Sequence, residues 1–132
     1  MLYHIKHAIV PDSFCDEVIK QGEEKDLKKA EIQDGKETSR SSDVSWLDEE
    51  KLGTSLTNLV VIANKESKWN FSLKEFEPLQ YTIYNKGDYY GWHIDNHNKP
   101  YDNGMVRKLS FTLCLNEDYE GGEFSFCTPH PV

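Results

Sequence analysis

The spacing of apolar residues changes about halfway along this chain of 132 residues. Over residues 48–64 apolar side chains recur at every third or fourth position, which predicts one long amphipathic helix. Farther on, Leu79, Tyr81 and Ile83 alternate with polar residues, and the same alternation returns over 109–115. A period of two is typical of strands with one apolar face. We therefore expect a helical first part followed by a β-rich second part.

The N-terminal part of the chain predicts a strand followed by a helix. Apolar residues alternate at the start of residues 2–10, as expected of an opening strand. The helix should begin near Pro11, because Asp12 or Ser13 can accept hydrogen bonds from the unpaired N–H groups of a first turn. Gly22 is a natural end for this helix.

Shorter elements are expected between and after the helices. Residues 27–32 favour a short strand, whereas residues 33–43 are polar without periodicity and predict a loop. Alternation predicts further strands over 69–73 and, after the glycine pair at 121–122, over 123–127.

Helices followed by a run of antiparallel strands favour packed sheets closed into a barrel or jelly roll, with the helices outside. The expected fold class is mainly β with N-terminal helices, of the α+β type. The length is that of a single domain with one core. Within residues 1–132 we expect a helical support region over 1–66 and the first strands of the barrel over 67–132.

Charge and composition restrict the partners and the location. The chain carries 23 acidic and 15 basic residues, a formal charge of −8, which opposes binding to nucleic-acid phosphates. It has no apolar run near the roughly 20 residues of a membrane span and no apolar leader, so we expect a soluble, cytoplasmic protein. Cys15, Cys114 and Cys127 are odd in number and widely spaced, which fits reduced thiols.

His93 and Asp95 are the leading candidates for a metal site. We expect the two residues at the rim of a strand, where residues two apart project from the same face, about 6 to 7 Å apart at the backbone. An imidazole beside a carboxylate, with no thiolate nearby, favours a non-haem Fe(II) centre with two histidines and one carboxylate over a structural zinc site. The alternative is a hydrogen-bonded pair at a strand end that holds no metal.

The source of a third ligand is open. His97 continues the same face, but residues four apart in a strand are about 13 Å apart, so it fits a loop residue better. His130 lies between two prolines and can fold back over the site or form a surface turn. His4 and His7 fit ordinary strand or surface positions, and a Cys127 thiolate would suit zinc.

Three ordered sequence blocks carry a family resemblance over about residues 79–126. They are Tyr84-x-x-Gly87-x-x-Tyr90-x-x-His93-x-Asp95, then Arg107-x-x-Ser110-x-Thr112-x-x-Leu115, then Asp118-Tyr119-Glu120-Gly121-Gly122-Glu123. In order and spacing the blocks resemble the iron- and 2-oxoglutarate-dependent dioxygenases, in their prolyl 4-hydroxylase-like branch.

The resemblance implies a double-stranded β-helix in which Fe(II) is held by His93, Asp95 and a distant histidine. It implies that 2-oxoglutarate chelates the iron, that Tyr84 helps to hold this cosubstrate, and that Tyr90 lies close to the reaction pocket. In such enzymes O2 oxidises 2-oxoglutarate to succinate and CO2 and a C–H bond is hydroxylated, with ascorbate as a frequent reductant. The substrate stays open among prolyl, other amino-acid, peptide and small-molecule targets.

Two departures from the family pattern bear on this expectation. Cys114 stands where many relatives place a tyrosine that contacts the cosubstrate. The sequence also stops at Val132, before the family's second metal histidine and its carboxylate-binding Arg or Lys, so we expect only the first half of the barrel. A longer product, a second polypeptide or self-association would have to cover the strand edges.

Each of these residues can instead have a purely structural role. Tyr84 and Tyr90 can be core aromatics, and Trp92, on the face opposite His93, fits a packing role. Arg107 fits a structural ion pair better than a cosubstrate clamp. The competing hypothesis for the whole chain is an inactive truncated remnant, or a metal- or partner-binding module of the same fold.

Overall fold

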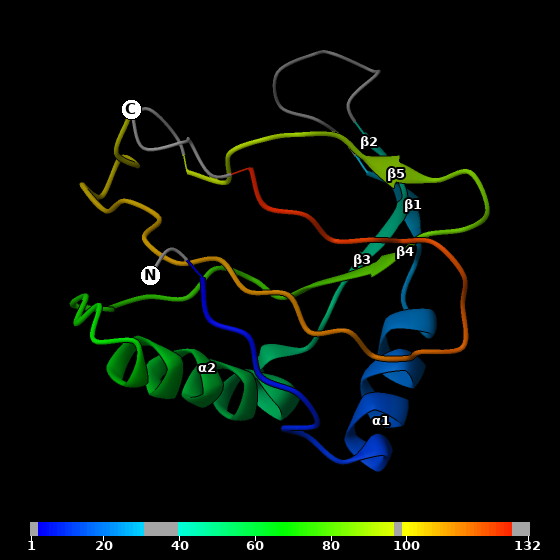
Figure 1. Cartoon of the computed structure of the whole chain (residues 1–132), viewed down its shortest axis with the longest axis horizontal. Coiled ribbons are helices and arrows are strands. Elements are labelled where there is room, and N and C mark those ends of the chain that lie inside the picture. The colour runs from blue at the N-terminus through cyan, green and yellow to red at the C-terminus, as the bar shows by residue number, and fades with distance from the viewer. Residues whose placement is uncertain (1–2, 31–39, 97–98, 128–132) are drawn as a thin grey trace.

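A computed structural model describes residues 3–30, 40–96 and 99–127 of the chain. Its two helices lie on one side of the molecule, and the strands gather on the other (Figure 1). In chain order the elements are α1 (Asp12–Glu23), β1 (Lys28–Lys29), β2 (Arg40–Ser41), β3 (Asp43–Trp46), α2 (Glu49–Glu66), β4 (Gln80–Ile83) and β5 (Tyr89–Tyr90).

The strands form two small antiparallel sheets. One has the order β1-β3-β4, with Val44 of β3 opposite Thr82 of β4, and the other pairs β2 with β5. Because β2 and β3 are separated by Ser42 alone, one stretch of chain belongs to both sheets. Through β2 the stretch pairs with β5, and through β3 it pairs with β4. It therefore joins the two sheets, and the chain after β5 carries the candidate site.

The core lies where the two helices meet the central sheet. Its buried members are Val18, Leu47, Leu52, Leu56, Leu79 and Tyr81. The packing is close between α1 and β4, since a Cβ placed on Gly22 would lie 2.2 Å from Cδ1 of Tyr81. Ser45 of β3 adds a buried hydrogen bond of 2.8 Å to the Gly22 carbonyl.

The long helix and strand β4 confirm the spacing argument. Helix α2 buries its predicted stripe, and Asp48 caps it by accepting a hydrogen bond of 3.0 Å from the Glu50 N–H. Strand β4 alternates as predicted, with Tyr81 buried and Gln80 exposed. Strand β1 falls inside the predicted range 27–32.

The N-terminal predictions are partly wrong. No strand is assigned over residues 3–10, and Ala8 has a φ of 50°, which is incompatible with extended chain. Helix α1 begins as predicted, but Pro11 occupies the N-cap without a side-chain hydrogen bond, so the capping role of Asp12 or Ser13 is wrong. Gly22 lies inside the last turn of α1 and does not end it.

The predicted strands over 69–73, 109–115 and 123–127 are absent from the described structure, and so is a closed barrel. The alternation is kept only in part: Leu109, Leu113 and Leu115 are partly buried and Cys114 is exposed, but Phe111 of the predicted apolar face is 44% exposed. A strand also requires a hydrogen-bonded partner, and this segment has none among the paired strands. The coarser α+β class, helices with antiparallel sheets, is confirmed.

The region predicted to be a loop contains two strand starts that were missed. Strands β2 and β3 begin at Arg40 and Asp43, inside the predicted loop 33–43. Residues 33–39 of that loop, and residues 31–32 of the strand predicted before it, lie outside the described residues. Neither described helix is both long and apolar enough to cross a bilayer.

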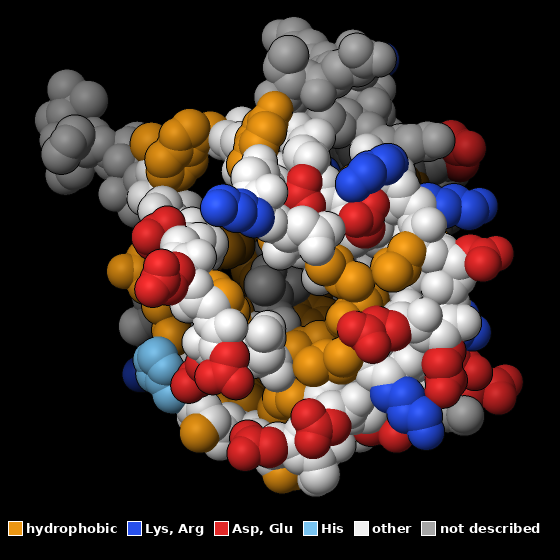
Figure 2. Space-filling view, turned by 90° about the vertical axis from the view of Figure 1, so that its right-hand side faces the viewer, with side chains coloured by type: hydrophobic (Ala, Val, Ile, Leu, Met, Phe, Trp, Pro, Cys, Tyr) orange, Lys and Arg blue, Asp and Glu red, His pale blue; other side chains and the backbone are white. Residues whose placement is uncertain are grey.

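Large apolar side chains remain exposed on the second half of the chain. Trp92 is 73% exposed, Ile94 83% and Phe124 69%, so the packing role expected for Trp92 is wrong. Figure 2 shows apolar side chains around a hollow on one face of the molecule, with acidic side chains along its rim.

Candidate metal centre

His93 and Asp95 lie in an irregular segment directly after β5, and not in a strand as expected. Their side chains nevertheless converge: Nε2 of His93 lies 3.1 Å from Oδ1 of Asp95. Both side chains are accessible, with exposed fractions of 36% and 46%. The two predicted ligand atoms are therefore adjacent and open to solvent.

The hydrogen bonding of His93 leaves a position between the pair that a proton or a metal ion can occupy. Nδ1 of His93 lies 2.7 Å from the Gly91 carbonyl, which can only accept, so Nδ1 carries the hydrogen. In the neutral ring Nε2 then presents a lone pair to the Asp95 carboxylate, and two acceptors face each other. Either a proton or a metal ion between them relieves this repulsion.

The distance between these atoms also fits a metal. Two ligand atoms bonded at about 2.1 Å to one ion and at a right angle to each other lie about 3.0 Å apart. The observed separation of 3.1 Å between Nε2 and Oδ1 matches this value. In addition, a metal-binding histidine is usually oriented by a hydrogen bond from its other ring nitrogen, as Nδ1 of His93 makes here. The residues present thus fit a divalent cation.

Tyr90 supports the imidazole of His93. The two rings are stacked, with centroids 3.6 Å apart and an interplanar angle of 10°. The guanidinium of Arg40 lies over the Tyr90 ring at 4.6 Å, and Arg40 and Tyr90 are opposite each other in the β2–β5 pair. The ring of His93 is therefore tied to a sheet through Tyr90.

Arg107 connects Asp95 to Glu77, in the irregular segment before β4. Its guanidinium binds the Glu77 carboxylate through Nε, at 2.7 Å, and through Nη2. Nη1 donates to the backbone carbonyl of Asp95 at 2.5 Å. The hydrogen bond with Glu77 raises the pKa of Arg107 above its usual value. The structural ion pair predicted for Arg107 is confirmed.

Tyr84 lies immediately after β4 and is 50% exposed. The turn that follows it closes through the Asp88 N–H, which donates to the Asn85 carbonyl at 2.9 Å, and leads into β5. Tyr84 is thus a surface side chain and not a core aromatic. Its contact with a cosubstrate stays a prediction.

A third ligand is not found within the part of the chain that the structure describes: no group of three or more His, Cys, Asp or Glu residues could hold a metal there. His97 and His130 both lie outside the described residues. His4 contacts the end of α2, where its Nδ1 lies 2.8 Å from Oγ of Ser67, in agreement with its expected ordinary role.

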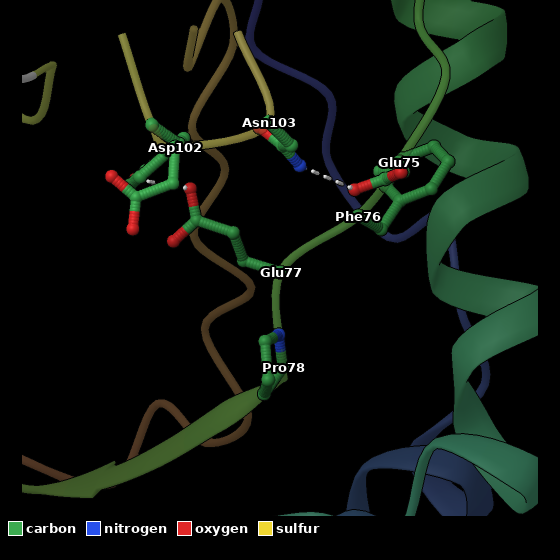
Figure 3. Close-up of a pocket in the computed structure, with 7 residues that line it drawn as sticks. Glu75, Phe76, Glu77, Pro78, Asp102 and Asn103 are labelled. Carbon is green, nitrogen blue, oxygen red and sulfur yellow. Dashed lines mark hydrogen bonds between the residues drawn. The ribbon is translucent and has the colours of Figure 1, made fainter. Parts of the chain in front are cut away.

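An open cleft of about 500 Å³ lies beside the Arg107 ion pair. Glu77 lines it and is also the carboxylate that Arg107 binds. Figure 3 shows Glu77 pointing toward Asp102, while Asn103 donates to Glu75 across the cleft at 3.4 Å. Sequence reasoning missed Glu77, because nothing local marks it; the only signal was that Arg107 needed an acidic partner.

Comparisons with known proteins agree with the family resemblance of the second half of the chain. Residues 79–131 match the family model of the 2OG-Fe(II) oxygenase superfamily, a family that uses Fe(II) and 2-oxoglutarate. A PKHD-type hydroxylase of Synechococcus sp. strain CC9902 is 55% identical over 42 residues, which are 30% of this chain and 18% of that protein. A PKHD-type hydroxylase of Shewanella oneidensis is 48% identical over 52 residues, 37% of this chain and 23% of that protein.

These matches confirm the resemblance to the prolyl-hydroxylase-like oxygenases for the second half of the chain. The chain spans about a fifth of the length of the curated relatives that it matches. No solved structure gives a significant match.

Proposed function

We propose that this chain carries part of the active site of an Fe(II)- and 2-oxoglutarate-dependent oxygenase that hydroxylates a C–H bond, with His93 and Asp95 as two of the iron ligands. The observation that carries this proposal is the pair of facing acceptor atoms, Nε2 of His93 and Oδ1 of Asp95, at 3.1 Å. The similarity of residues 79–131 to the oxygenase family supports it.

This assignment gives the cofactor and the side chains different roles. Bound Fe(II) with 2-oxoglutarate and O2 supplies the oxidising chemistry, in which 2-oxoglutarate becomes succinate and CO2. Asp95 contributes a negative charge to the cation, and His93 a neutral donor. Tyr90 holds the imidazole plane and lines the pocket, and Tyr84 binds the cosubstrate. The similarity to PKHD-type hydroxylases supports hydroxylation as the outcome, with the substrate left open.

The proposed architecture around this site is a double-stranded β-helix. The packing of Leu113 and Leu115 against the core supports it, because these two residues already present apolar side chains to the core from one face. In the complete site the segment would gain strand partners, supplied by other sequence, by a second polypeptide or by a second copy. The same arrangement would bring in a further histidine as third ligand and a basic residue for the cosubstrate carboxylate. The free thiols of the three cysteines support a reducing, cytoplasmic location.

The test is metal binding by the whole chain, read by the electron paramagnetic resonance signal of free Mn2+, which serves as an air-stable substitute for Fe(II). We expect His93→Ala and Asp95→Ala each to abolish the binding seen in the wild type, because each removes a ligand. His4→Ala, at the end of α2, is the control and should bind as the wild type does. If all variants bound Mn2+ as the wild type does, His93 and Asp95 would not be metal ligands.

Cosubstrate turnover distinguishes the oxygenase from a second candidate, a metal-binding module without catalysis. The second candidate is favoured by one observation, that only two ligands converge in the described part of the chain. Succinate formation from 2-oxoglutarate with Fe(II), lost in Asp95→Ala, identifies the enzyme. Metal binding with no succinate identifies the module.

A further inference from the structure

The segment that carries His93 and Asp95 has little apolar anchorage. Residues 91–96 contain no helix or strand, and the two large apolar side chains among them point away from the core: Trp92 is 73% exposed and Ile94 83%. Apolar burial therefore does little to hold this segment in place. Its position depends on the polar and stacking contacts that it makes.

On the His93 side, the contacts are local. His93 bonds the carbonyl of Gly91, two residues earlier, and stacks on Tyr90, three residues earlier. These contacts orient the ring of His93, but neither of them reaches Asp95.

On the Asp95 side, the contact is long-range. Nη1 of Arg107 donates to the backbone carbonyl of Asp95 at 2.5 Å, across twelve residues of chain. A bond to the main chain fixes the Cα of Asp95 while leaving both carboxylate oxygens available. The Arg107 side chain is 28% exposed, and a charged donor strengthens its hydrogen bond to the carbonyl.

Glu77 fixes Arg107 in turn. It binds the guanidinium through Nε and Nη2, and it also accepts a hydrogen bond of 3.0 Å from the hydroxyl of Tyr101. Glu77 stands two residues before Leu79, which is 9% exposed in the core and whose carbonyl accepts from the Leu47 N–H at 2.9 Å. The chain of contacts thus runs from Asp95 through Arg107 and Glu77 to the central sheet.

We propose that Arg107 is a positioning residue: held by Glu77, it fixes the backbone of Asp95 so that the carboxylate and His93 present their ligand atoms at the spacing that a divalent cation requires. The inference deepens the proposed function and rests on it. Arg107 itself touches neither the metal nor the substrate in this role.

The fork of the guanidinium is essential to the proposal. Three different nitrogens make the bonds to Glu77 and to the Asp95 carbonyl, and a planar fork holds all three in one geometry. A lysine at this position would keep the charge and one bond, but it would lose the rigid connection between the two partners. Arg107→Lys should therefore behave as a defective variant and not as a conservative one.

The experiment compares Mn2+ affinity in the whole chain for wild type, Arg107→Lys, Arg107→Gln and Glu77→Gln. Loss of a residue that orients a ligand typically costs about 10- to 100-fold in metal affinity, and we expect this range for both Arg107 variants. Glu77→Gln should weaken binding in the same direction but less, since an amide can still accept from Arg107. Lys6→Gln, which breaks the exposed Lys6–Glu66 pair of 2.6 Å at the end of α2, is the matched control and should leave the affinity unchanged.

A second measurement separates positioning from general stability. Backbone 15N relaxation should show the order parameters of residues 93–96 falling from the rigid range of about 0.85 to below about 0.6 in Arg107→Gln, with the core strands unchanged. Unaltered affinity and unaltered order in Arg107→Gln would overturn the proposal. Should Arg107→Gln fail to fold, Glu77→Gln decides in its place by the same two measurements. Absence of Mn2+ binding in the wild type would instead overturn the proposed function.

Discussion

At the candidate centre, the atoms that matter for metal binding are Nε2 of His93 and Oδ1 of Asp95. The bond from Nδ1 of His93 to the Gly91 carbonyl leaves Nε2 as an acceptor, 3.1 Å from an oxygen that is also an acceptor. A proton or a metal ion between the two acceptors relieves their repulsion. The same two residues joined by a proton would form an ordinary ion pair, and a substitution can distinguish the two cases.

Asp95→Asn makes this distinction at nearly constant shape. The amide can donate to Nε2 of His93, so the metal-free variant should be as stable as the wild type or more stable by less than about 1 kcal/mol. Its Mn2+ binding should be lost with the charge. Urea unfolding and the Mn2+ titration measure the two effects. A variant less stable than the wild type would indicate a protonated His93 paired with Asp95 and no need for a metal.

The elements place these atoms through close packing that tolerates little added volume. Helix α1 contacts both β3 and β4, and it approaches β4 at a glycine, Gly22, against the ring of Tyr81. Helix α2 begins at the Asp48 cap and buries its apolar stripe in the same core. Strand β4 is held between these helices and β3, and it is β4 that follows Glu77, the anchor of Arg107.

Gly22→Ala tests this packing. Alanine favours a helix over glycine by about 1 kcal/mol, but its Cβ would lie 2.2 Å from the Tyr81 ring. We expect the steric overlap to outweigh the gain in helix propensity and to lower the free energy of unfolding by about 1 to 3 kcal/mol. Lys20→Ala, an exposed site on the same helix, should change stability by less than about 0.5 kcal/mol. Urea denaturation of both variants gives the comparison, and a more stable Gly22→Ala would show that the ring moves freely.

The stability of the whole molecule should depend on pH through one carboxylate, that of Asp88, beside the small β2–β5 sheet. Asp88 accepts hydrogen bonds from Oγ of Ser41 in β2 and from the Asn85 N–H, so its carboxylate ties β2 to the turn before β5. The hydrogen bond from Ser41, and then that from Asn85, lower the pKa of Asp88 below its usual value. A folded-state pKa below the unfolded value of about 3.9 means that the ionised carboxylate stabilises the fold above that pH. The stabilisation is lost as the pH falls through the folded-state pKa.

The expected consequence is a pH-dependent effect of Asp88→Asn. The variant should be less stable than the wild type at pH 7, and the difference should shrink toward zero as the pH drops below about 4. Thermal unfolding at pH 7, 5, 4 and 3 follows this difference. Asp102→Asn, at an exposed turn, is the control, and a difference that does not change with pH would exclude the carboxylate bridge.

Local sequence determined the elements whose burial depends on spacing alone. Helix α2, the alternation of β4 and the inward face of Leu109, Leu113 and Leu115 follow from which residues are apolar and how far apart they stand. The closeness of His93 and Asp95 also follows from sequence, because they are only two positions apart. Their place outside a strand and the contact of Asp95 with Arg107 were not foreseen.

Only the tertiary structure decided the pairings between distant parts. Strands β2 and β3 are short and have no clear strand pattern in sequence, and they pair with β5 and β4, which come much later in the chain. The segment 109–115 has a strand's alternation but no paired neighbour in the described chain. Glu77 became the partner of Arg107 because folding brings them together across thirty residues. Spacing along the chain fixes which face turns inward, whereas a hydrogen-bond partner is fixed by which backbone or side chain arrives opposite, and that depends on the packing of the whole molecule.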